Sequence, residues 1–246
     1  MRNIGIIRDG ESDFYVIRKL LKVIFEKEKS EKLSDDNFLN FDSSDFSFYN
    51  DLNEFIRKRN KNCIFEDEEY TKFSDKIISK IYTAFSRMNR EFDGVTNKDI
   101  LVLYSDSEKL LLNDENYFKD WAYSIKQIFD YSVDKFYHKI SKQGFLYETV
   151  PLIIPMILFP SSEIVVASCM YDFSRENIRE MKPTPDLKQK VYGYPNIPDA
   201  FENNAIEKTL DTYLVSENLN EIYKVTPELR KIIHILSNWN CAQHCV

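Results

Sequence analysis

The segment IGIIRDGESDF, residues 4–14, joins a short apolar run, an acidic turn and the start of an amphipathic stretch. Its isoleucines predict a buried strand over residues 4–7, which the turn at Asp9 and Gly10 ends. A helix is predicted next, with Ser12 as its N-cap and apolar side chains at helical spacing through Phe25. A strand followed directly by such a helix is a typical first unit of an α/β fold.

The same alternation continues through the first 170 residues. Further strands are predicted at residues 100–104 and 152–159, with a weaker one at 38–41 or 46–49. Helices are predicted near residues 51–59, over 74–88 with Ser74 as the N-cap, over 116–141, and from about Glu163 with Ser161 or Ser162 as the N-cap. This order predicts a parallel sheet covered by helices on both faces.

The chain changes character after about residue 170. Prolines punctuate residues 183–198, and helices are predicted only near residues 205–215 and 227–239. We therefore expect an α/β domain over residues 1–170 and a loop-rich, mainly helical extension over residues 171–246. The extension would pack on the sheet or form a lid.

Composition excludes several classes of protein. The 246 residues include only five glycines, and no glycine-rich dinucleotide loop, phosphate loop or nucleophile elbow is present. The three histidines form no H-E-x-x-H zinc motif. One glycine, Gly10, lies between Asp9 and Glu11, where a tight strand-to-helix turn would require it.

Charge and cysteine content indicate the environment. The chain has 33 Lys and Arg against 40 Asp and Glu, a net charge of −7, which argues against nucleic-acid binding driven by net charge alone. No apolar run is long enough to span a membrane, and four scattered cysteines predict a reducing, cytoplasmic location. Assembly into a homo-oligomer is left open.

Acidic residues follow three of the predicted strands. Asp9 and Glu11 follow the first, Asp106 and Glu108 follow the strand at 100–104, and Glu163 follows the strand at 152–159. Functional groups of parallel sheets collect at the carboxyl ends of the strands. If these strands are neighbours, the carboxylates would repel one another unless a hard cation such as Mg²⁺ or Mn²⁺ lies among them. Each acid taken alone could equally cap or solvate the helix that follows it.

Three segments carry a family resemblance. DGESD at residues 9–13 resembles the first motif of TOPRIM (topoisomerase–primase) domains, in which a strand ends in an acid and a glycine and a second acid follows. LVLYSDSE at residues 101–108 is similar to the second motif, an apolar strand that ends in Asp-x-Asp. PSSEIVVA at residues 160–167 is similar to a third block, of bacterial TOPRIM-like proteins linked to phage defence beside an ATPase.

The resemblance, which covers about residues 1–170, implies a Rossmann-like, TOPRIM-type fold. It also implies metal-dependent cleavage of nucleic-acid phosphodiesters, with a defence ATPase as a partner. By match, Asp9 takes the place of the family's glutamate, Asp106 that of its first aspartate and Glu108 that of its second. We expect catalytic roles for Asp9, Glu11, Asp106 and Glu108. We expect Mg²⁺ or Mn²⁺ ligands in Asp9, Asp106, Glu108 and Glu163.

Two departures from the family pattern leave an alternative. Asp9 is one methylene shorter than the family's glutamate, and Glu108 is one longer than its aspartate. A misplacement of about 1 Å can cost a hundredfold in rate. The alternative is a catalytically weak or inactive subunit that binds an ATPase partner, and a small-molecule phosphohydrolase is a third reading.

Basic residues near the third block are candidates for contact with nucleic acid. Lys182, Lys188 and Lys190 lie in the proline-punctuated stretch, where they could reach a phosphate backbone beside the metal. The denser basic run at residues 57–61 is interpreted as a solvated helix face. His138 and His234 are interpreted as surface or core histidines, and the C-x-x-H-C cluster at residues 241–245 as a tail without metal.

Overall fold

A four-stranded parallel sheet lies at the centre of the computed structural model, which describes residues 2–41, 68–106, 117–158, 161–172, 185–194, 197–226 and 228–238. The strand order is β2-β1-β3-β4, and all three neighbouring pairs are parallel. The strands are β1 (Ile4–Ile7), β2 (Phe38–Phe41), β3 (Ile100–Asp106) and β4 (Leu152–Leu158). These bounds confirm the predicted strands, and the other position considered for the weak strand, 46–49, is outside the described residues.

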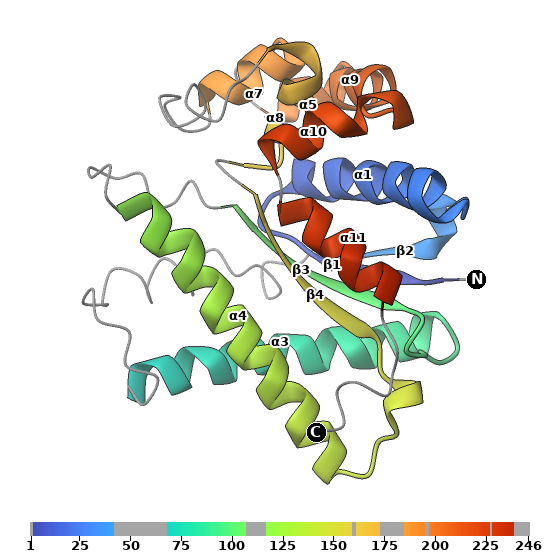
Figure 1. Cartoon of the computed structure of the whole chain (residues 1–246), viewed down its shortest axis with the longest axis vertical. Coiled ribbons are helices and arrows are strands. Elements are labelled where there is room, and N and C mark those ends of the chain that lie inside the picture. The colour runs from blue at the N-terminus through green and yellow to red at the C-terminus, as the bar shows by residue number, and fades with distance from the viewer. Residues whose placement is uncertain are drawn as a thin grey trace.

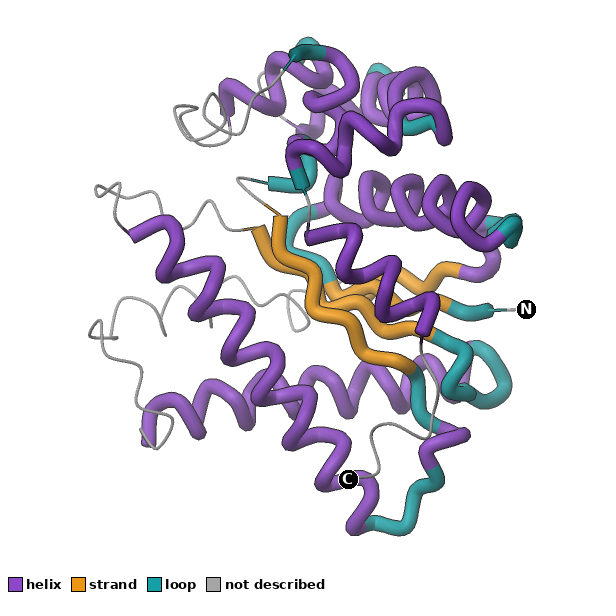
Figure 2. Tube along the Cα trace, viewed as in Figure 1, coloured by secondary structure: helices purple, strands orange, loops and turns teal. Residues whose placement is uncertain are grey.

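Helices cover both faces of the sheet (Figure 2), which confirms the predicted α/β class. The long helices are α1 (Glu11–Lys29), α3 (Glu68–Glu91) and α4 (Tyr117–Lys142). The C-terminal helices are α5 (Ile164–Met170), α7 (Pro185–Tyr192), α8 (Ile197–Glu202), α9 (Ala205–Tyr213), α10 (Leu219–Val225) and α11 (Glu228–Asn238). Short 3-10 turns occupy Asp35–Asn37, Tyr147–Thr149 and Ser216–Asn218.

Two predicted details of the helices are wrong or untested. Ser74 does not cap α3, because that helix begins at Glu68, and Ser74 is instead buried inside it, where it accepts a hydrogen bond from Ser132. The prediction failed because a serine ahead of an apolar stripe has the same local pattern whether it caps the helix or lies within it. The helix predicted near residues 51–59 lies outside the described residues.

Alternate side chains of the central strands are buried in two separate hydrophobic cores. Ile4 and Ile6 of β1 join one buried cluster with α1 and the C-terminal helices, whereas Ile7 joins the other with α3 and α4. In β3, Val102 points to the first cluster and Leu103 to the second. Because both faces are buried, these strands have nearly continuous apolar sequences, which is why they were predictable.

The chain after residue 171 shares the first of these cores. Leu187, Leu210, Ile222 and Leu229 are buried in the same cluster as Ile17 of α1. Figure 1 shows α5 and α7 to α10 as a further layer above α1, while α11 lies against the sheet. The helical extension is therefore packed on the α/β domain. In the described part of the chain, no helix is long and apolar enough to cross a membrane.

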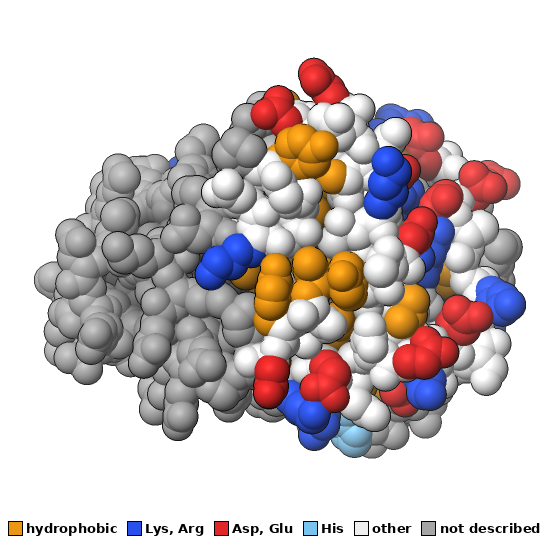
Figure 3. Space-filling model, turned by 90° about the horizontal axis from the view of Figure 1, so that it is seen from above, with side chains coloured by type: hydrophobic (Ala, Val, Ile, Leu, Met, Phe, Trp, Pro, Cys, Tyr) orange, Lys and Arg blue, Asp and Glu red, His pale blue; other side chains and the backbone are white. Residues whose placement is uncertain are grey.

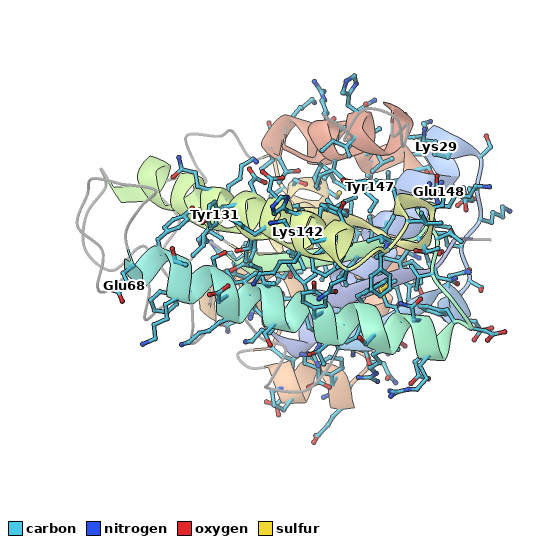
Figure 4. The ribbon with its side chains drawn as sticks, turned by 90° about the horizontal axis from the view of Figure 1, so that it is seen from below. Lys29, Glu68, Tyr131, Lys142, Tyr147 and Glu148 are labelled. Atoms are coloured by element: carbon cyan, nitrogen blue, oxygen red, sulfur yellow. The ribbon has the colours of Figure 1, made fainter. Side chains whose placement is uncertain are left out.

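Helices α3 and α4 pack against each other on the opposite face, as Figure 4 shows from below. The rings of Tyr70 on α3 and Tyr131 on α4 meet edge to face, with centroids 5.3 Å apart. Close approach of α3 to the sheet depends on Gly5, because a Cβ there would lie 2.6 Å from the Met88 sulfur and 2.8 Å from Phe41 Cε2. Gly5, in the middle of β1, is thus a packing requirement.

Candidate functional site

The carboxyl ends of β1, β3 and β4 meet at one edge of the sheet. Asp9 follows β1 by two residues, Asp106 is the last residue of β3, and Glu163 follows β4. Because β1 connects to β2 on one side and β3 lies on its other side, the switch point of the strand order falls between β1 and β3. Ligands of open parallel sheets bind at such points.

Direct hydrogen bonds join the three strand ends. The backbone N–H of Asp106 donates to Asp9 Oδ2 at 2.9 Å. Asp106 Oδ1 accepts from the backbone N–H of Ser162 at 3.2 Å and from the hydroxyl of Tyr104. The sequence predicts this convergence only if the strands are neighbours, and the strand order shows that β1 and β4 both lie beside β3.

Three buried serines hold the carboxylates in place. Ser12 Oγ donates to Glu163 Oε1 at 3.2 Å, and Ser161 Oγ donates to Glu163 Oε2 at 2.6 Å. Ser162 Oγ donates to Asp13 Oδ1 at 2.7 Å. The Glu163 side chain is completely buried, so these hydroxyls replace part of the hydration that it loses.

The predicted N-cap role of Ser12 is wrong. Helix α1 begins at Glu11, and its N-cap is Gly10, whose φ of −116° is an extended conformation open to any residue. The turn therefore does not require glycine for its backbone geometry, contrary to the sequence interpretation. Ser12 lies in the first turn with its hydroxyl directed to Glu163, a partner 151 positions away that no local pattern reveals.

Sequence reasoning missed Asp13 as a site residue. Its carboxylate is only 1% exposed and accepts hydrogen bonds from the Gly10 N–H at 2.5 Å and from Ser162. Burial, followed by the negative charge of Glu163, raises the pKa of Asp13 to about 7. A signal was available, because residue 13 lies on the same helical stripe as the buried Ile17 and Leu20.

The other predicted site residues are placed less centrally. Glu11, the first residue of α1, is exposed, and Lys190 is exposed on α7. Lys188 is half-buried, with its Nζ 4.0 Å from Glu163 Oε1. Glu108, Lys182 and the cluster at residues 241–245 lie outside the described residues. His138 and His234, interpreted as surface or core histidines, are both exposed and therefore lie at the surface.

Two buried tyrosines border the carboxylates and were also missed. Burial and the charge of Asp106 hold the pKa of Tyr104 well above its usual range. Burial and the charge of Glu163 do the same for the pKa of Tyr192 on α7. Both hydroxyls therefore stay protonated, and that of Tyr104 donates a hydrogen bond to Asp106 Oδ1. Tyrosines in apolar segments give no local signal that separates such a role from ordinary core packing.

The carboxylates that meet at the strand ends are of a chemical type that binds hard divalent cations. Asp9, Asp13, Asp106 and Glu163 offer only oxygen atoms, which Mg²⁺ and Mn²⁺ prefer. As the side chains stand, no three His, Cys, Asp or Glu of the described residues are arranged as a metal site. A cation would therefore require carboxylates to turn from their serine partners or Glu108 to complete the set.

The surface on the side of the C-terminal helices carries both acidic and basic side chains (Figure 3). Figure 3 shows basic side chains scattered among acidic ones around a central group of hydrophobic side chains. Any contact with a phosphate backbone here would rest on a few specific groups.

Comparisons with known proteins give no independent assignment. No family model matches the chain, and neither a curated protein nor a solved structure matches it.

Proposed function

We propose that this protein hydrolyses nucleic-acid phosphodiesters with the help of Mg²⁺ or Mn²⁺. The observation that supports the proposal is the meeting of Asp9, Asp106, Asp13 and Glu163 at the switch point of the sheet, linked by hydrogen bonds. Several buried carboxylates close together are costly unless positive charge or protons compensate them. A divalent cation would supply this positive charge, and it would also enable the cluster to polarise a phosphate group for hydrolysis.

Asp9, Asp106 and Glu163, together with Glu108, are the proposed ligands. A cation bound there would polarise a phosphate oxygen and lower the pKa of its bound water. Asp13 is proposed to accept or return a proton, because a pKa of about 7 matches neutral conditions. Glu11, exposed at the start of α1, is the less suitable of the two for that role. Lys188, beside Glu163, would bind substrate phosphate.

Cleavage assays test the proposal. Purified protein is incubated with plasmid, linear DNA and RNA in Mg²⁺, in Mn²⁺ and in EDTA, beside Asp106→Asn and an Asp75→Asn control. Asp75 is an exposed acid of α3 whose contact is an ion pair with Lys139 at 3.2 Å, away from the strand ends. We expect cation-dependent cleavage that Asp75→Asn retains and Asp106→Asn loses. Activity that survives in Asp106→Asn would overturn the proposal.

A second candidate function has its own support. The carboxylates of Asp13, Asp106 and Glu163 already accept hydrogen bonds from the chain, as they would in a purely structural cluster. Large hydrophobic side chains at Tyr171 and Ile235, 42% exposed each, lie in the C-terminal part of the chain. The alternative is therefore an inactive subunit that binds a partner, for which we retain a defence ATPase as the candidate. Association with an ATPase, unchanged by Asp9→Asn and Asp106→Asn, would favour this alternative.

A further inference from the structure

Helix α7 directs two hydrogen-bond donors toward the carboxylates. Lys188 and Tyr192 are four residues apart and therefore lie on neighbouring turns of the same helix face. The buried side chains of Leu187 and Val191 anchor α7 in the core, where the helix packs against α5. Lys188 Nζ lies 4.0 Å from Glu163 Oε1, so this face of α7 is turned to the site.

The hydroxyl of Tyr192 is an unexplained feature of this face. The residue is only 4% exposed, and its buried Oη has no hydrogen-bond partner among the described residues. Buried hydroxyls are nearly always hydrogen-bonded, so this hydroxyl has an unused donor that a group entering the site could accept. Burial, and then the negative charges of Glu163, Asp13 and Asp106, hold the pKa of this hydroxyl well above its usual range, so it keeps its proton.

We propose that Tyr192 and Lys188 form a subsite for one phosphate group of the substrate, opposite the carboxylates. This inference rests on the proposed function, because a phosphate would be repelled by the bare carboxylates and bind only when a divalent cation offsets their charge. Tyr192 donates a neutral hydrogen bond to one phosphate oxygen, and Lys188 donates a charged one. Because the tyrosine hydroxyl is buried, α7 must shift outward to admit the group.

Lysine and tyrosine make different contributions to this subsite. The ammonium group of Lys188 supplies positive charge. Because its side chain is half-buried, that charge lies between Glu163 and the solvent. The hydroxyl of Tyr192 supplies direction, since one O–H donor is satisfied by one correctly placed acceptor oxygen. We therefore expect loss of Lys188 to weaken phosphate binding strongly and loss of the tyrosine hydroxyl to weaken it moderately.

Calorimetry on the full chain separates metal binding from phosphate binding. EDTA-treated wild type, Tyr192→Phe and Lys188→Met are titrated first with Mg²⁺ and then, when loaded with Mg²⁺, with inorganic phosphate. Lys224→Met, which removes an exposed lysine of α10 that is paired with Glu221, and Tyr223→Phe, on the same helix, serve as matched controls. Circular dichroism verifies that each variant is folded.

We expect similar Mg²⁺ affinity in all five proteins and no phosphate binding without Mg²⁺. Phosphate affinity should fall roughly three- to tenfold in Tyr192→Phe and roughly ten- to a hundredfold in Lys188→Met, with both controls unchanged. Unchanged phosphate affinity in either variant, or phosphate binding absent from Mg²⁺-loaded wild type, would overturn the subsite while leaving the metal site intact. Failure of the wild type to bind Mg²⁺ would instead overturn the proposed function itself.

Discussion

Asp106 and Asp9, 97 positions apart, are joined by a hydrogen bond of 2.9 Å from the backbone N–H of the former to Oδ2 of the latter. The bond ties the end of β3 to the turn that follows β1. Asp9 therefore has a structural role as an acceptor whether or not it also binds a cation. The substitution Asp9→Asn separates the role as an acceptor from the role as a cation ligand, because the asparagine amide retains an acceptor oxygen and loses the negative charge.

Asp9→Ala and Asp9→Asn should differ in stability. Both variants lose the negative charge, but only alanine removes the acceptor of the Asp106 N–H. We expect the free energy of unfolding of Asp9→Ala to be about 1–3 kcal/mol below that of Asp9→Asn. Urea unfolding measures the difference, with Glu11→Ala as an exposed control expected within about 0.5 kcal/mol of wild type. Equal stability of the two Asp9 variants would show that the bond contributes nothing.

The raised pKa of Asp13 predicts that the free energy of unfolding falls as the pH rises. Its pKa is raised from 3.8 to about 7 in the folded protein, so between these values the folded state binds more protons than the unfolded state. One pKa unit corresponds to about 1.4 kcal/mol, so the loss of stability from pH 4 to pH 7 is on the order of a few kcal/mol. Urea unfolding of EDTA-treated protein at several pH values measures it.

Asp13→Asn is the variant that identifies the group. An asparagine cannot titrate, so the fall in stability between pH 4 and pH 7 should shrink. The variant also loses the acceptor for either Gly10 or Ser162, which costs about 1 kcal/mol at every pH. The pH slope, and not the absolute stability, is therefore the readout. A slope equal to that of wild type would assign the titration to another group.

The sheet could be predicted from sequence because its central strands are buried on both faces. Residues 100–104 and 152–158 are nearly continuous apolar runs, and such runs predict strands that are buried on both faces. Helices α7, α8 and α10 were not predicted, because each is short and punctuated or preceded by residues typical of loops. Their stability comes from tertiary burial of side chains such as Leu187 and Ile222.

The acidic positions of the site could be predicted, but their connections could not. Acids after strands are visible in the sequence, whereas the order β2-β1-β3-β4 that brings three strand ends together is not. The serine hydroxyls illustrate the limit most clearly. Ser12 has the local pattern of an N-cap, and only the fold places it beside Glu163.

A double-mutant cycle distinguishes the two roles of Ser12. If Ser12 acted only as a cap, its replacement by alanine and the replacement Glu163→Gln would have additive effects on stability. Because Ser12 Oγ donates to Glu163 Oε1 at 3.2 Å in a buried setting, we expect a coupling energy of about 0.5–3 kcal/mol. Thermal or urea unfolding of the four proteins provides it. Thr212→Ala, whose exposed hydroxyl bonds to the Lys208 carbonyl on α9, should show no coupling to Glu163→Gln.

Gly5→Ala should destabilise the fold through a steric clash. The added Cβ would lie 2.6 Å from Met88 Sδ and 2.8 Å from Phe41 Cε2, so α3 or β2 has to move. Overpacking of this kind costs about 1–3 kcal/mol. The cost should be smaller when Gly5→Ala is introduced into a Met88→Ala background, since the sulfur contact is then gone. A cost that does not depend on Met88 would point to backbone effects at Gly5 instead.

Mg²⁺ should stabilise the protein, and more so at higher pH. A ligand that binds only the folded state adds about 2.7 kcal/mol to the free energy of unfolding at 100 times its Kd. Carboxylates must be deprotonated to bind a cation, and Asp13 beside them holds a proton up to about pH 7. We therefore expect a larger Mg²⁺-induced rise in Tm at pH 8 than at pH 5.5, reversed by EDTA. Asp106→Asn should lose the rise and Asp75→Asn should keep it, because only Asp106 lies at the strand ends. A rise of equal size in both variants would mean that Mg²⁺ binds elsewhere, and it would remove the main support for a metal centre at this edge of the sheet.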